Sequence, residues 1–151
     1  MSTLTRRRDQ SAAHEGWVIF FGDVRVGAIC LRSGAPNHAP QWSWSCGFYP
    51  GTTPGQHRTG SAETFDEARR AFQSAWQELA ASRTEADYEA WREQRDWTAW
   101  KYRMHDRALP LPTQRSEGVA RCFCGAVITN PSLVSHIRAA HRLNSSSGGA
   151  S

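Results

Sequence analysis

Two cysteines and two histidines lie within 20 residues near the end of this 151-residue chain. They are Cys122, Cys124, His136 and His141. Thiolate and imidazole groups in a set of four suit a tetrahedral Zn²⁺ ion. The segment holds too few apolar residues to fold by itself, whereas structural zinc contributes about 10–16 kcal/mol in finger peptides. The sequence therefore predicts that these four side chains bind zinc.

The spacing resembles that of a C2H2-type zinc finger shortened by one residue at two places, over about residues 120–142. One residue separates the two cysteines, and eleven residues lie between Cys124 and His136. Val127, Leu133 and His136 repeat the apolar spacing of the classical finger. Asn130-Pro131 predicts the start of its helix, because Asn is a good cap and Pro suits the first helical position. Four protein ligands imply a closed, structural metal site.

The resemblance also implies that the base-reading positions are Thr129, Ser132 and Ser135. None of them is Arg, Asn or Gln, which make discriminating contacts with bases. Residues 107–151 carry five Arg and one Glu. We therefore expect weakly sequence-specific contacts with nucleic-acid phosphates, made by Arg115, Arg121, Arg138 and Arg142. The alternative is that these arginines are solvated or face an acidic protein partner.

The larger, N-terminal part begins with a β pattern. Residues 17–21 and 24–31 flank the two-residue connection Gly22-Asp23, which is typical of a hairpin. In residues 41–49, apolar side chains alternate with small or polar ones, which predicts a strand with one buried face. A short fourth strand is expected around residues 57–59.

Two helices are expected to follow. Thr64 and Glu67 form a capping box, and the residues behind them have helical apolar spacing: Ala68, Phe72, Ala75, Trp76 and Leu79. A second helix runs from Thr84 to about Asp106, with aromatic residues on two sides. A helix that is apolar on two faces is buried on both. The second cover is either the first helix with the N-terminal arm, or a second subunit in a homodimer.

The predicted fold is α+β: a three- to four-stranded antiparallel sheet packed on two helices, plus a small C-terminal zinc finger. The predicted parts are a basic flexible arm (1–15), the sheet-and-helix domain (16–106), a Pro-containing linker (107–118), the finger (119–143) and a flexible tail (144–151). The element around Gly60–Ala68 resembles sheet-plus-helix modules such as the Arm-type domains of integrases and HicB-like antitoxin domains, and also small bacterial proteins of unknown function. This resemblance implies no activity.

Candidate catalytic side chains all have simpler explanations. His38 and His57 lie in polar loops, Asp66 belongs to a helix N-terminus, and His105 lies near a helix C-terminus. Cys30 and Cys46 are expected to be core thiols. The sequence has no phosphate-binding glycine loop, nucleophile elbow or paired-carboxylate motif. We expect a protein that is not an enzyme.

The longest apolar run is residues 17–21, far too short for a membrane span. No secretion signal is evident at the N-terminus, so a cytoplasmic protein with reduced cysteines is expected. Two functional hypotheses remain. One is a regulatory or accessory protein that binds nucleic acid through its backbone, and the other is a protein-binding adaptor or inhibitor.

Overall fold

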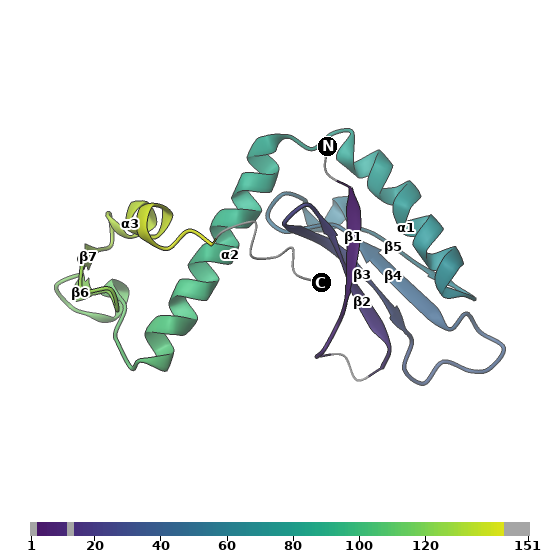
Figure 1. The fold of residues 1–151 in the computed structure, drawn as a ribbon, viewed down its shortest axis with the longest axis horizontal. Coiled ribbons are helices and arrows are strands. Elements are labelled where there is room, and N and C mark those ends of the chain that lie inside the picture. Colours follow the sequence, from purple (N-terminus) through teal and green to yellow (C-terminus); the bar gives the residue numbers. More distant parts are fainter. Residues whose placement is uncertain (1–2, 12–13, 144–151) are drawn as a thin grey trace. The chain divides into compact units, whose positions relative to one another are not determined.

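The computed structural model describes residues 3–11 and 14–143 (Figure 1). The chain forms two compact units whose boundary lies between Trp91 and Arg92, inside a long helix. We call the described residues up to Trp91 the sheet unit, and residues 92–143 the Cys2His2 unit. The predicted tail at 144–151 lies outside the described residues.

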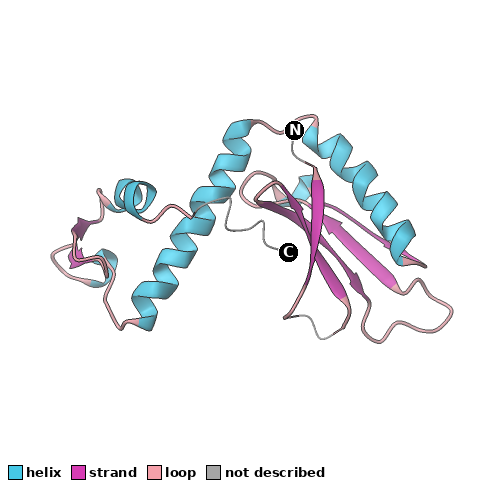
Figure 2. Ribbon diagram, in the orientation of Figure 1, coloured by secondary structure: helices cyan, strands magenta, loops and turns pink. Residues whose placement is uncertain are grey.

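The sheet unit contains one five-stranded antiparallel sheet in the order β1-β2-β3-β4-β5 (Figure 2). The strands are β1 (Leu4–Arg8), β2 (Gly16–Phe21), β3 (Val24–Leu31), β4 (Trp42–Cys46) and β5 (Arg58–Ala62), with a 3-10 turn η1 (Pro54–Gln56) before the last. The predicted hairpin at Gly22-Asp23 is confirmed, with Phe21 opposite Val24. Gly22 has a φ of 62°, which glycine tolerates at no steric cost.

The prediction of a flexible arm is wrong for residues 4–8. They form β1, which pairs with β2 in continuous register from Leu4 opposite Phe21 to Arg8 opposite Trp17. The guanidinium carbons of Arg6 and Arg8 lie 4.7 and 4.8 Å from the Trp17 ring centroid. Cation–π contacts of this kind compensate for the low apolar content of the strand. The sheet consequently has one strand more than the three to four expected.

Helix α1 (Phe65–Ala80) packs against the sheet, mainly on β4 and β5. Thr64 caps it as predicted, since the Glu67 N–H donates to the Thr64 hydroxyl at 3.2 Å. Its buried residues are those of the predicted stripe: Ala68, Phe72, Ala75, Trp76 and Leu79. Trp42 and Trp44 of β4 meet Phe65 and Phe72 of the helix, so the apolar face of the alternating strand lies toward α1.

Helix α2 (Glu85–Asp106) begins in the sheet unit. The Tyr88 ring stacks on Phe48 at 5.3 Å and on Phe21 at 5.5 Å between centroids. Trp91 packs against the same apolar core. Tyr88 and Trp91 are therefore covered by the sheet unit as expected, whereas Tyr102, expected on the same side of the helix, is 66% exposed.

The Cys2His2 unit consists of α2 from Arg92 onward, a 3-10 turn η2 (Pro112–Gln114), the strands β6 (Val119–Arg121) and β7 (Val127–Thr129), and helix α3 (Leu133–Ala140). Its buried core joins the second half of α2 to the hairpin and α3 through Trp100, Met104, Ala120, Cys122, Ile128, Leu133 and Ile137. The second cover of α2 is therefore this unit. Burial of Trp100 therefore requires neither the first helix with the N-terminal arm nor a second subunit, the two packing partners that the sequence suggested.

The segment predicted as a linker is also packed. Pro112 is fully buried, and Leu109 and Leu111 lie against the core of the Cys2His2 unit. The Leu111 N–H donates to the Gln114 side-chain oxygen at 2.8 Å, which closes the η2 turn. The C-terminal compact unit thus begins at Arg92 and includes residues 107–118, which had been predicted to be a linker before it.

None of the helices in the described part of the chain is both long and apolar enough to cross a membrane.

Candidate metal centre

Cys122, Cys124, His136 and His141 come together in the Cys2His2 unit, and their ligand atoms all lie within 4.8 Å of one another. Two are supplied by the β6–β7 hairpin and two by α3 and its C-terminal end. The sequence prediction that these four side chains meet is therefore confirmed. They form a group that could hold a metal ion.

Three of the distances between ligand atoms fit the edges of a tetrahedron around one ion. Cys122 Sγ lies 3.3 Å from His141 Nε2, and Cys124 Sγ lies 3.6 Å from His136 Nε2. The two Nε2 atoms are 3.2 Å apart. Metal–nitrogen bonds of about 2.0–2.1 Å and metal–sulfur bonds of about 2.3 Å give tetrahedral edges of about 3.3–3.8 Å. The donor set and its spacing therefore match a closed four-ligand site.

A tight turn accommodates the single residue between the cysteines. The Gly125 N–H donates to the Cys122 carbonyl at 2.9 Å, and the Cys122 N–H donates to the Ala126 carbonyl at 2.8 Å. Gly125 has a φ of 96°, which favours glycine because it has no Cβ. The turn brings both sulfur atoms to the same side of the hairpin.

Two details of the finger resemblance are wrong. Helix α3 begins at Leu133 with Ser132 as its cap residue, instead of at Asn130-Pro131. Val127 is exposed, and the hairpin buries its neighbour Ile128 instead. Alternation along the strand explains the second difference: Ile128 pairs with Ala120 on the buried side, so Val127 lies on the outer side.

Trp100 of α2 contacts the centre directly, which the sequence reading missed. Its indole N–H donates to Cys122 Sγ at 3.3 Å, and both side chains are buried. An N–H donor stabilises the negative charge of a thiolate ligand. The one sequence signal that pointed to Trp100 was the second aromatic side of the predicted helix, for which the sequence did not show a packing partner.

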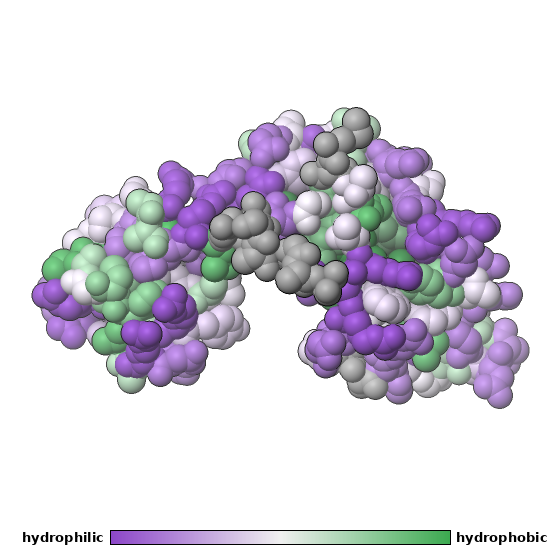
Figure 3. Space-filling model, viewed as in Figure 1, coloured by the Kyte–Doolittle hydropathy of each residue, from purple (hydrophilic) through white to green (hydrophobic). Residues whose placement is uncertain are grey.

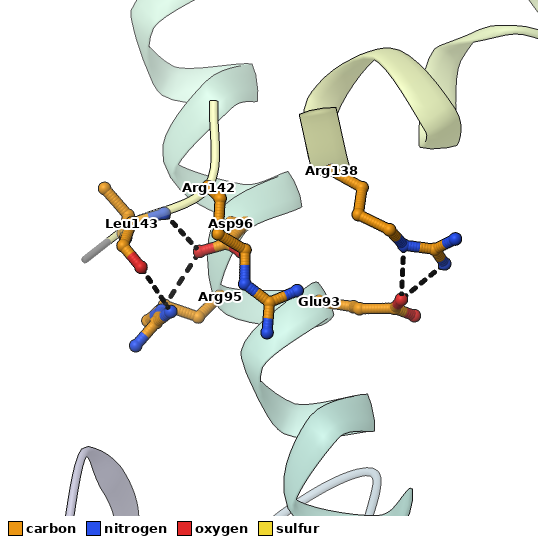
Figure 4. Close-up of polar contacts among 6 residues, drawn as sticks. All are labelled: Glu93, Arg95, Asp96, Arg138, Arg142 and Leu143. Carbon is orange, nitrogen blue, oxygen red and sulfur yellow. Dashed lines mark hydrogen bonds and ion pairs between the residues drawn. The ribbon is translucent and has the colours of Figure 1, made fainter. Parts of the chain in front are cut away.

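A buried carboxylate holds the segment that follows His141 (Figure 4). Asp96 of α2 is 2% exposed, and its Oδ1 accepts from the Leu143 N–H at 3.2 Å and from Arg95 Nε at 3.1 Å. Its Oδ2 lies 3.5 Å from Nε of Arg142. These contacts hold the chain immediately after the candidate ligand His141.

The surroundings of His141 favour its neutral form. Burial, followed by the nearby positive groups His136 and Arg103, lowers the pKa of His141 below its ordinary value. A neutral imidazole is the form that ligates a metal ion. The Phe123 ring packs against the His141 ring at 4.7 Å, and the Arg103 guanidinium covers Phe123 at 4.1 Å.

The four arginines predicted to contact phosphates all have partners within the Cys2His2 unit. Arg138 Nε donates to Glu93 at 3.0 Å, and Arg142 lies beside Asp96 (Figure 4). Arg115 pairs with Glu117 at 3.2 Å, and Arg121 donates to the Gly125 carbonyl at 2.8 Å. The carboxylates partly neutralise the charge of Arg115, Arg138 and Arg142, whereas the carbonyl contact leaves the charge of Arg121 in place.

Two of the three predicted base-reading positions, Thr129 and Ser132, bind each other. The Thr129 N–H donates to the Ser132 hydroxyl at 2.9 Å, and the Ser132 N–H donates to the Thr129 hydroxyl at 3.2 Å. This reciprocal pair stabilises the turn before α3. Ser135 lies on α3 and is exposed.

The remaining candidates do not converge with the metal centre. His38, His57 and His105 are exposed, and Asp66 pairs with Arg69 at 2.8 Å and Arg70 at 2.9 Å. Cys46 is a core thiol as expected, since it is buried in the core of the sheet unit, and this burial raises its pKa to about 12. Cys30 is only half-buried, on the side of the sheet opposite α1, where its sulfur lies 3.3 Å from the Ser43 hydroxyl.

Comparisons with known proteins find no matching family model, no matching curated protein and no matching solved structure.

Proposed function

We propose that Cys122, Cys124, His136 and His141 hold one zinc ion with a structural role. Two thiolates and two imidazoles at tetrahedral spacing favour zinc over harder cations, which prefer oxygen ligands. With four protein ligands the ion would have no open position for a substrate or a reactive water. It would join the β6–β7 hairpin to α3 and the second half of α2.

Elemental analysis of protein purified without added metal tests this part of the proposal. One equivalent of zinc per chain is expected, with Cys122→Ser and His141→Ala each retaining far less. Well-folded wild-type protein with a zinc content near zero would contradict it.

We further propose that the chain is a non-enzymatic accessory or regulatory protein that associates with nucleic acid mainly through backbone contacts. The observation that carries this proposal is a segregation of charge in the sheet unit. Strands β1 to β5 contain five Arg and no Asp or Glu, whereas helix α1 contains three acidic and two basic residues. Of the strand arginines, Arg7 and Arg25 lie on the face away from α1, and the other three lie on the α1 side. Arginines on a face to which the strands contribute no carboxylate suit phosphate binding.

Fluorescence anisotropy with a labelled duplex over a series of salt concentrations tests the association. Each engaged arginine should contribute about −0.9 to the slope of log K against log salt, irrespective of sequence. Absence of binding to duplex DNA, single-stranded DNA and RNA at low salt would contradict this proposal and leave the zinc proposal untouched.

A protein-binding adaptor is the second candidate function. It is favoured by exposed apolar side chains on the Cys2His2 unit, where Val127 is 60% exposed and Val134 57%. Figure 3 shows hydrophobic surface over the β6–β7 hairpin. One stoichiometric partner that survives nuclease treatment, and is lost in Val127→Asp, would support this function instead.

A further inference from the structure

The two faces of the sheet differ in composition. Trp42, Trp44 and Cys46 of β4 lie toward α1, so the alternating residues Ser43 and Ser45 lie on the opposite face. We call this opposite face the outer face. Its residues follow from the strand register, which places Ala28 and Thr59 on either side of Ser45, and Cys30 and Ser61 on either side of Ser43.

Small and hydroxyl-bearing side chains form a shallow depression on the outer face. It has a volume of about 440 Å³, and its small lining residues include Ala28 and Gly60. Its lining includes the hydroxyls of Ser43, Ser45, Thr59 and Ser61, with Arg32 at one end of β3. Hydroxyl groups can donate to phosphate oxygens, and the small residues allow a bulky backbone to approach closely.

Arg32 borders this depression, and two further arginines lie on the same face of the sheet. Arg7 lies opposite Val18, and Arg25 lies opposite Phe20, both in the register of the outer face. The Arg7 guanidinium stacks on the Phe20 ring at 4.9 Å, and the Arg32 guanidinium donates to the Pro40 carbonyl at 2.8 Å. These contacts position two guanidinium groups without neutralising them. Arg25 is exposed and forms no ion pair with any residue that the structure describes.

Acidic residues are kept out of the strands that form this surface. In the first 63 residues they are confined to connections and strand ends: Asp9, Glu15, Asp23 and Glu63. The net charge of the whole N-terminal part does not show that the strands lack acidic residues, because most of the acidic residues are in α1 and the first part of α2.

We propose that the outer face of the sheet, through Arg7, Arg25, Arg32 and the hydroxyls of β4 and β5, binds the phosphate backbone of a duplex nucleic acid. This inference rests on the proposed association with nucleic acid and moves its main contact from the Cys2His2 unit to the sheet. Phosphate contacts of this kind position a protein on a duplex without reading its sequence. The complementary partner is a polyanion, because the face offers cations and donors but no carboxylate from a strand.

A duplex fits the face better than a single strand does. Single-strand binding relies on aromatic rings on which successive bases stack. On the outer face Phe20 is already covered by Arg7, and Trp44, which borders the depression, packs its ring against Phe72 of α1. The face can therefore grip phosphates but provides little stacking surface.

The test compares two triple variants of the full chain that remove the same charge. In the first, Arg7, Arg25 and Arg32 are changed to Ala; in the control, Arg58, Arg69 and Arg70, which lie on the α1 side, are changed to Ala. Anisotropy titrations with a 20-base-pair DNA duplex should show a slope flattened by about 2.7 in the first variant, about 0.9 for each lost contact. The control should keep the wild-type slope to within about one contact.

A second pair of variants guards against an effect of folding. Ser45→Glu places a carboxylate in the depression, and Ser74→Glu places one on the exposed side of α1. Only Ser45→Glu should weaken binding by tenfold or more, with both variants melting like the wild type.

Three results would overturn the inference. If the slope flattens in an Arg121→Ala, Arg138→Ala variant but not in the sheet variant, the face is wrong while the proposed function stands. Tighter binding to a single-stranded 20-mer than to the duplex would overturn the choice of a duplex. If the wild type binds no nucleic acid at all, the inference and the proposed association both fall.

Discussion

The indole N–H of Trp100 donates to the sulfur of Cys122 across 22 positions of sequence. This contact connects α2 to the candidate metal centre and explains why a tryptophan in the second half of a polar helix is only 1% exposed. A hydrogen bond to a ligating thiolate orients it and spreads its charge. We therefore treat α2 as part of the candidate metal-binding unit, although it supplies no ligand.

Trp100→Phe should weaken metal retention, because it removes the N–H donor while keeping an aromatic ring in the core. Loss of a hydrogen-bonding partner of a ligand typically lowers metal affinity by about 10–100-fold. Competition with a chromogenic zinc chelator measures this. Trp97→Phe is the matched control, since Trp97 stacks beside Trp100 at 5.6 Å but, within the described residues, donates no hydrogen bond to a cysteine sulfur. Equal affinity of the two variants would show that the N–H···S bond contributes nothing.

Removal of the metal should loosen α2 beyond Arg92 as well as the segment around the ligands. Trp100 and Met104 are buried only by the core that the centre would hold together. Hydrogen exchange with and without chelator should show lost protection over residues 97–106 and 119–141, and unchanged protection in β2 to β4. Protection that is lost at 119–141 but kept throughout α2 would contradict this extended coupling.

Asp96→Asn should destabilise the Cys2His2 unit more than Glu93→Gln. Both replace a carboxylate of α2 that pairs with an arginine, but the Asp96 side chain is 2% exposed and that of Glu93 38%. Leaving buried partners poorly satisfied costs about 1–3 kcal/mol, whereas a surface pair contributes about 0–1 kcal/mol. Thermal unfolding monitored by tryptophan fluorescence compares the two. Similar melting temperatures for both variants would contradict this difference.

Acidification should release the metal and destabilise the Cys2His2 unit. The folded pKa of His141 lies below its ordinary 6.5, so the unfolded chain takes up the proton first as pH falls. The contribution of neutral His141 is therefore complete above about pH 6.5 and is lost as pH falls through the folded pKa. Metal content after equilibration between pH 8 and pH 4 should fall with pH, and thermal unfolding of the metal-free protein should show the unit losing stability below about pH 6.5. A metal-free unit that becomes more stable as pH falls below 6.5 would contradict the sign of the shift.

The cysteines should separate into two classes of reactivity. Burial raises the pKa of Cys46 to about 12, so at pH 8 only about one thiol in ten thousand is ionised, whereas Cys124 is exposed. Mass spectrometry after iodoacetamide treatment should find Cys46 unmodified with or without chelator. Cys122 and Cys124 should become modified only when chelator is present. Rapid modification of Cys46 in folded protein would show that the sheet unit opens readily.

Locally encoded features were predictable from the sequence. The cap at Thr64, the apolar stripe of α1, the Gly22-Asp23 hairpin and the meeting of the four ligands each depend on short-range spacing. Register was harder, because one residue decides which face of a strand is buried. The finger pattern therefore assigned Val127 to the core where the hairpin buries Ile128.

Residue spacing could not predict which distant segments of the chain pack against each other. The aromatic residues of α2 indicated two buried sides, but nothing local shows that the second side packs on a hairpin and helix that follow later in the chain. Strand β1 was missed for a different reason. Its sequence LTRRR has one apolar residue, and its pairing depends on backbone bonds and on arginine stacking over rings of β2.

Strand β1 also has a consequence for protein handling. It occupies the edge of β2, whose sequence GWVIFF is almost wholly apolar, and it presents three arginines there instead. A chain truncated or clipped before Asp9 would leave that apolar strand as an open template for other molecules. Basic residues near the N-terminus, which look dispensable, would then act as gatekeepers against aggregation of the whole protein.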